Sequence, residues 1–165
     1  SVVQKDTVEK FGKTAELLGE LPKESPFFYL METARNLCLV LEKKADLGRE
    51  VRLAYSQEDK ETLQEIANIK IPVLLQRLQD FYQSFRTQWN LENKSFGFEV
   101  QTVRIGGLLQ RLKDVQEILN AYLREEISGI AELNEPQKAF HYFEQNEIRS
   151  LNYNLWTDIV SPSKI

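Results

Sequence analysis

Few side chains in this sequence could perform chemistry, and those few are dispersed. The chain has one histidine, His141, and one cysteine, Cys38, about a hundred residues apart. A structural zinc site needs four such ligands. HExxH, CxxC, GxGxxG and GxxxxGK spacings do not occur either. We therefore expect no metal ligand and no cofactor.

The groups that could serve as nucleophile, acid or base have ordinary surroundings in the sequence. His141 stands between two aromatic residues without a serine or cysteine pattern typical of a nucleophile, so we interpret it as a packed or surface imidazole. Cys38 lies in an apolar helical pattern, which indicates a small buried hydrophobe rather than a reactive thiol. Glu125 and Glu126 close a charged helix end, where two acids are ordinary. The sequence predicts no catalytic residue.

The apolar stretch from Trp89 to Arg111 is more informative, because two consecutive glycines interrupt a helical stripe there. A glycine inside a helix costs about 1 kcal/mol relative to alanine. Gly106 and Gly107 therefore suggest a close approach by another backbone or a bulky side chain. Arg104 and Arg111 stand seven residues apart, roughly two helical turns, and flank the glycines on nearly one face. This pattern favours a docking surface over a catalytic site.

The candidate docking face combines this glycine-arginine stripe with neighbouring aromatic residues and a tryptophan of the tail. Its members are Trp89, Phe96, Phe98, Arg104, Gly106, Gly107, Arg111 and Trp156. We expect at least one arginine to reach outward, with 156–160 packing close by. The alternative for each arginine is an ion pair with an acid of this chain, because a buried guanidinium requires a partner.

Length and charge limit the classes of protein. With 165 residues and 42% hydrophobic residues, residues 1–165 are expected to form one helical domain with its own core. The net charge of -4, with acids and bases interspersed, does not predict the basic face of a nucleic-acid-binding protein. No apolar run reaches the roughly 18 residues of a membrane span, and the N-terminus lacks the charged-then-apolar layout of a signal peptide. We expect neither nucleic acid nor membrane as partner.

Two features of the chain bear on its origin. A single cysteine tolerates a reducing compartment, so we expect a cytoplasmic location. The sequence begins at Ser1 without a methionine and with a helix close behind. We expect it to be excised from a larger protein.

Hydrophobic periodicity predicts helices in the first third of the chain. Apolar residues at three- and four-residue steps predict a helix over 8–18 that ends between Gly19 and Pro22. Ser25 as N-cap and Pro26 at the first helical position then open a long helix. Its apolar stripe continues to Tyr55, and its charged face is interpreted as solvated.

The remaining pattern predicts three more helices. Ser56 as N-cap predicts a short helix to about Ala67, and Pro72 lies near the start of the next helix, which ends at Trp89. After a turn, the stripe over 100–122 marks another helix of about six turns. The tail near Pro162 is expected to be extended. The predicted fold is all-α, an antiparallel bundle of about four to five helices with an irregular or extended C-terminal tail.

The block from Phe96 to Arg111, FGFEVQTVRIGGLLQR, continuing through Leu119 to Leu123, resembles the helical C-terminal domain of bacterial glycoside hydrolase family 20 enzymes, the β-N-acetylhexosaminidases. Other similar segments are 44–48, 52–55, 89–94, 130–135 and 156–163. The resemblance implies a parent enzyme whose β/α barrel removes terminal N-acetylglucosamine or N-acetylgalactosamine. In that family an adjacent Asp-Glu pair carries the chemistry, with the substrate's acetamido group as nucleophile.

This sequence contains no Asp-Glu dipeptide, so no catalytic residue is carried over, and we expect the fragment to be inactive by itself. The resemblance implies a non-catalytic domain that packs on and stabilises the β/α barrel of its parent chain and meets a glycan only through that enzyme. The first alternative is a free-standing interaction or regulatory bundle that binds a peptide or helix in a groove between its aromatic helices. The second is an enzyme in its own right.

Overall fold

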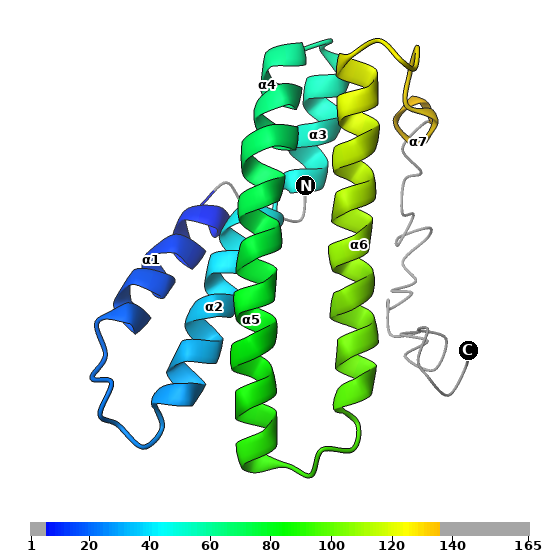
Figure 1. Ribbon diagram of the computed structural model, residues 1–165. Helices are drawn as coiled ribbons and strands as arrows, with labels where there is room; N and C mark the ends of the chain where they lie inside the picture. Colours follow the sequence, from blue (N-terminus) through cyan, green and yellow to red (C-terminus); the bar gives the residue numbers. More distant parts are fainter. Residues whose placement is uncertain (1–5, 136–165) are drawn as a thin grey trace, which may run out of the picture.

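The computed structural model describes residues 6–135, and over this range the chain forms helices and turns without a strand (Figure 1). The elements are α1 (Thr7–Gly19), α2 (Phe28–Lys44), α3 (Leu47–Ser56), α4 (Lys60–Glu65), the π-helix η1 (Ile66–Lys70), α5 (Ile71–Glu92), α6 (Phe98–Leu123) and α7 (Ala131–Asn134). Because α4, η1 and α5 run on without a break, the described chain has five long helices and one short turn of helix. The all-α prediction is confirmed. The predicted extended tail lies outside the described residues.

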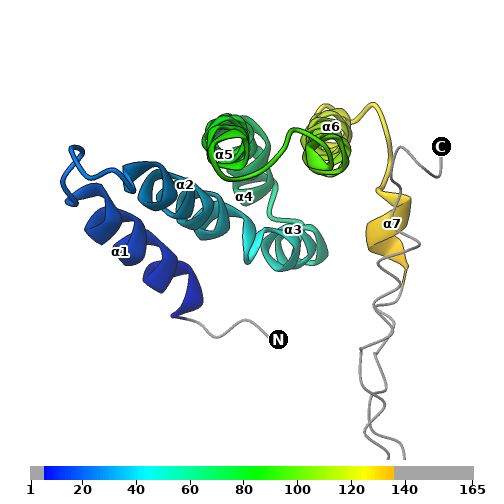
Figure 2. The same ribbon diagram turned by 90° about the horizontal axis from the view of Figure 1, so that it is seen from below.

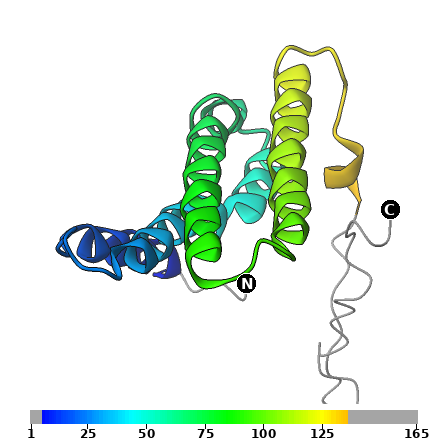
Figure 3. The ribbon, with the colours of Figure 1, turned by 60° about the horizontal axis from the view of Figure 1, so that its bottom comes forward.

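The helices α1, α2, α5 and α6 lie in a row, each antiparallel to the next (Figures 1 and 2). α1 packs on α2, α2 on α5, and α5 on α6. α3 lies across one side of this row, against α4 and near the C-terminal half of α6 (Figures 2 and 3). The bundle is therefore open: the row leaves broad faces of its helices without a helical neighbour.

The core lies where α3, the α4–α5 rod and α6 converge. Leu63, Ile71 and Leu74 are fully buried, and Val51 and Leu119 close the cluster from α3 and α6. On α6 the buried positions are Phe98, Ile105, Leu112 and Leu119, which repeat every seven residues. A seven-residue repeat keeps one narrow seam of a helix against its partner. The helix predicted over 100–122 is thus confirmed, and Leu112 and Leu119 of its predicted stripe are buried, whereas Gly107 of that stripe is exposed.

The single long helix predicted from Phe27 to Tyr55 is wrong, because the chain turns at Ala45 and Asp46. α2 ends at Lys44, and α3 begins at Leu47 with Asp46 as its N-cap residue. The carboxylate of Asp46 accepts two hydrogen bonds from the Arg49 guanidinium. The turn lets Leu47, Val51 and Ala54 bury themselves in the core cluster, which a straight continuation of α2 could not do.

Two predicted N-caps are also displaced. Phe27, rather than Ser25, is the N-cap residue of α2, although the Ser25 hydroxyl accepts a hydrogen bond from the Phe27 N–H at 3.3 Å. The predicted cap at Ser56 is replaced by Asp59, whose carboxylate accepts from the Thr62 N–H at 3.0 Å. These hydrogen bonds to Thr62 hold the pKa of Asp59 below its usual value. The N-cap is the residue that can accept from the free N–H groups of the first helical turn. Several polar residues near each helix start could do so, and the sequence alone did not distinguish them.

Pro72 lies near the start of α5, as predicted, but α4 and the π-helix η1 run into α5 without a break, so Pro72 also lies within a continuous rod. The π-helix η1 directly before it widens the turn, and the Ile71 N–H donates to the Ile66 carbonyl five residues back. In this register the Ala67 carbonyl faces residue 72, and proline has no N–H to donate. The Gln116 side-chain amide of α6 donates to that carbonyl instead, at 2.7 Å. One side chain thus satisfies the group left by Pro72 and joins α6 to the rod.

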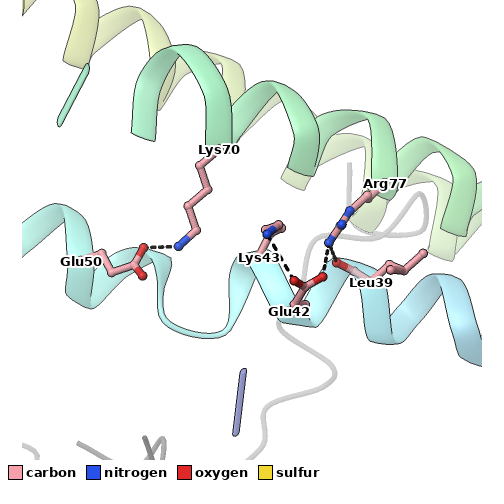
Figure 4. A network of polar contacts seen from close by, with 6 residues as sticks. All are labelled: Leu39, Glu42, Lys43, Glu50, Lys70 and Arg77. Carbon is pink, nitrogen blue, oxygen red and sulfur yellow. Dashed lines mark hydrogen bonds and ion pairs between the residues drawn. The ribbon is translucent and has the colours of Figure 1, made fainter. Parts of the chain in front are cut away.

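A polar network on the other side of the rod joins it to α2 and α3 (Figure 4). Arg77 donates to the Glu42 carboxylate at 2.6 Å and to the Leu39 carbonyl at 2.7 Å, and Lys70 pairs with Glu50. Burial by itself would raise the pKa of Glu42, but the hydrogen bonds from Arg77 and Lys43 outweigh it and lower the pKa. This network fixes the direction of α2 and α3 along the rod.

Candidate domain-docking site

The aromatic residues at the start of α6 are packed against α5. Phe98 is buried, and its ring lies 5.7 Å from that of Trp89 and 5.6 Å from that of Phe85. The Trp89 indole N–H donates to the Lys94 carbonyl at 2.9 Å and so ties the turn to the end of α5. Among the predicted docking residues, Phe98 therefore has an internal role, and Trp89 is half-buried by the same cluster.

Gly97 is the residue that makes this turn possible. Its φ of +94° lies in the left-handed region, and a Cβ there would come within 3.4 Å of the Trp89 ring. The Glu99 carboxylate accepts from its N–H at 2.8 Å, which caps the first turn of α6. The turn is thus held by its own contacts before any partner is considered.

Phe96 is the most exposed large apolar side chain among residues 6–135. It is 86% exposed, and Leu91 at the end of α5 is 64% exposed. Two large apolar side chains at one end of a helical hairpin are typical of a contact surface. Leu91 was not among the predicted site residues. The sequence did offer a sign of its exposure, because Leu91 is a large apolar residue that lies outside the apolar stripe ending at Trp89.

Gly106 and Gly107 lie on the exposed side of α6. They follow the buried Ile105 by one and two residues, which places them about 100° and 200° around the helix from the packed seam. A Cβ added at either position would meet no atom of the described chain within 4 Å. Within residues 6–135 the bundle therefore makes no close contact with these glycines. A close contact with an outside surface stays a prediction.

The two arginines differ in their surroundings. Arg111 is exposed and donates two hydrogen bonds to the Glu132 carboxylate of α7, at 2.8 and 3.0 Å. Of the two roles expected for Arg111, the structure therefore shows the ion pair with an acid of this chain. Arg104, one turn before Leu108, is half-buried. Trp156 lies outside the described residues.

A second surface feature was not predicted from the sequence. An apolar groove of about 400 Å³ lies between α3, α6 and α7. Its walls are leucine, isoleucine and valine side chains, including Val51, Leu108 and Val115, and the basic residues Lys44 and Arg52 stand beside them. No single helix stripe reveals such a groove, because its walls come from helices that are far apart in the sequence.

The acids and the thiol considered as catalytic groups have structural surroundings. Glu125 pairs with Lys60 at 2.8 Å and Glu126 with Arg124 at 2.7 Å, and these hydrogen bonds lower the pKa of both carboxyls. A general acid needs a raised pKa. Burial raises the pKa of the Cys38 thiol, which disfavours the reactive thiolate. Among residues 6–135 there is no group of three or more His, Cys, Asp or Glu that could hold a metal ion.

The fold and surface define a class: a small all-α domain with exposed apolar residues on its helices and at the α5–α6 turn. The sequence matches the family described as the Glycoside Hydrolase 20C C-terminal domain over residues 1–152. The chain therefore belongs to this family, and the resemblance to C-terminal domains of glycoside hydrolase family 20 is confirmed. No curated protein matched the sequence. Within the described residues, no helix is long and apolar enough to cross a membrane.

Proposed function

We propose that this domain is the non-catalytic partner of a catalytic β/α barrel in its parent chain, on which it packs through the exposed side of α6 and the α5–α6 turn. The observation that carries the proposal is the pair Gly106 and Gly107. Both are exposed in the middle of a long helix, and neither has a close neighbour in the described bundle. Each weakens the helix by about 1 kcal/mol relative to alanine. A surface that approaches the α6 backbone from outside would explain their presence.

Other features support the same surface. Phe96 and Leu91 expose apolar area at the start of α6, roughly 13 Å along the helix axis from Gly107. The family to which the chain belongs is by its description the C-terminal domain of a glycoside hydrolase. The catalytic groups of the parent enzyme would then lie in its barrel, in agreement with the lack of an Asp-Glu pair in this chain.

The alternative of a free-standing interaction module required a groove between aromatic helices. The rings of Tyr82, Phe85, Trp89 and Phe98 instead contact one another across α5 and α6. We therefore prefer the docking role. The cytoplasmic location and the single-domain boundaries stay expectations from the sequence.

The double variant Gly106→Ala with Gly107→Ala tests the proposal. In this 165-residue chain it should stabilise the fold by about 1 to 2 kcal/mol, because alanine favours the helix and the space around both positions is open. In the parent enzyme the two methyl groups should hinder docking. The domain should then unfold separately from the barrel in calorimetry, and limited proteolysis should release it.

Gly12→Ala in α1 is the matched control. It also adds a methyl group to a helical glycine, with the nearest Glu42 atom at an ordinary 3.6 Å, but it lies at the other end of the helix row (Figure 2). It should leave docking in the parent enzyme unchanged. If the double variant stabilises the parent enzyme as much as the isolated chain, nothing approaches α6 at the glycines and the proposed docking face is wrong.

A further inference from the structure

The groove between α3, α6 and α7 is too apolar to be an ordinary solvated surface. Leu108, Val115, Ile118 and Leu133 line it and remain only partly buried, although they pack against the core cluster. Apolar area of this kind is stabilised when another apolar surface removes it from water. The groove also lies beside Ile130, so it continues the core rather than standing apart from it.

The described chain ends at the edge of this groove. Tyr55 holds the approach to α7, since its hydroxyl accepts from the Ile130 N–H at 3.0 Å and bonds the Asn134 side chain at 2.9 Å. Arg52 donates to the carbonyls of Glu132, Leu133 and Glu135, each at 3.4 Å. Glu135 is the last described residue, so the described chain ends beside the groove.

The family match gives the length of chain that belongs with this bundle. It extends to residue 152, seventeen residues beyond Glu135. Those residues carry the apolar side chains Phe140, Phe143, Ile148 and Leu151. They also carry two acids, Glu144 and Glu147, and two bases, Lys138 and Arg149, so their formal charges balance. The groove likewise has charges of both signs at its edge, since Lys44, Arg52 and Glu132 line it. The apolar content of residues 136–152 therefore matches the apolar walls of the groove.

We propose that residues 136–152 of the same chain fill the groove between α3, α6 and α7 and complete the core of the domain. The occupant is then internal, and the barrel of the parent enzyme docks on α6 beside it, where the glycines lie. The inference does not rest on that docking. The groove could be filled by residues 136–152 even if the glycine face proved to have no partner.

Site-specific photo-crosslinking in the 165-residue chain tests the inference. Benzoylphenylalanine at Lys44, which is exposed at the groove, should form a cross-link to a peptide within 136–152. The yield should not change on dilution, because the contact lies within one chain. Mass spectrometry of the digest identifies the joined peptides. The matched control is the same residue at Lys113, an exposed lysine of α6 that does not line the groove. It should give no such product.

Three results overturn the inference: a yield that falls with dilution, which indicates a second copy in the groove; cross-links in the parent enzyme to its barrel alone; or no cross-link from either side. A second variant, with benzoylphenylalanine at Phe143, tests the same contact from the other side in case the Lys44 variant does not fold. It should cross-link to groove residues of α3 or α6. A variant is included only if it keeps the melting temperature of the unmodified chain.

Discussion

Three glycines within eleven residues serve different purposes, and only their surroundings distinguish them. Gly97 has a positive φ and faces the Trp89 ring, so it is required by the turn itself. Gly106 and Gly107 have ordinary helical backbones and open space around them. The sequence pattern alone grouped the last two with the arginines as one surface. The structure separates a glycine needed for folding from two that the described fold does not need.

Arg111 gives a test at the scale of one residue. Its ion pair with Glu132 is exposed on both sides, so Arg111→Met should lower the stability of the isolated chain by less than about 1 kcal/mol. In the parent enzyme a larger loss is expected if the guanidinium also reaches the docking partner. Chemical denaturation of both proteins measures the difference.

Glu132→Gln is the control for this comparison, because it removes the same ion pair and leaves the guanidinium in place. Equal effects of Arg111→Met and Glu132→Gln in the parent enzyme would mean that Arg111 serves only the contact between α6 and α7. Arg104→Met is compared between the two proteins in the same way. If it destabilises both equally, Arg104 belongs to the bundle and the outward role predicted for it is wrong.

At the scale of the element, the π-helix and Pro72 make a prediction about Gln116. Gln116→Met keeps the shape of the side chain but removes the donor to the Ala67 carbonyl, which is buried. An unsatisfied buried carbonyl costs about 1 to 3 kcal/mol, so the free energy of unfolding should fall by that amount. Gln110→Met, on the exposed side of the same helix, should change it by less than about 0.5 kcal/mol.

Pro72→Ala identifies the cause. It supplies a backbone N–H one residue after Ile71, and this N–H can donate to the carbonyl that Gln116 serves. In the Pro72→Ala background Gln116→Met should therefore cost less, and a double-mutant cycle measures the coupling. Equal costs in both backgrounds would show that the glutamine stabilises the protein by some route other than this carbonyl.

Elements with an uninterrupted stripe could be predicted from the sequence, and the joints between them could not. The stripe over 100–122 corresponds to α6, and the apolar steps over 8–18 correspond to α1. The break at Ala45 and Asp46 has neither glycine nor proline, and the apolar stripe runs through it. It exists because the turn lets Leu47, Val51 and Ala54 of α3 join the core cluster beside α4. Pro72 correctly marked the start of α5, but it did not reveal that α4 and a π-turn run into this helix without a break.

The candidate site was predictable to a similar degree. Exposed glycines and an exposed Phe96 agree with a surface, whereas Phe98 proved to be packed inside. Spacing along a helix gives the angle between two residues but not which side faces a neighbour. The groove between α3, α6 and α7 is formed by helices that are far apart in the sequence, so no local pattern contained it.

At the scale of the whole molecule, the row of helices has a consequence for how the domain opens. α1 stands at one end of the row, its main contact is α2, and it contributes no residue to the core cluster. Its ion pairs, Lys10 with Asp6 and Lys13 with Glu9, are exposed and lie within the helix or at its start. Detaching α1 therefore exposes one interface and leaves the α3–α5–α6 core intact.

Amide hydrogen exchange in low denaturant should resolve this opening. Amides of α1 should exchange through local unfolding at a lower free energy than those of Leu63 and Leu74, which exchange only when the whole domain unfolds. A single common free energy for α1 and the core would contradict it. Since each helix of the row is held mainly by its neighbours, the domain would lose its order from the α1 end inward, and cleavage by a protease would begin between α1 and α2.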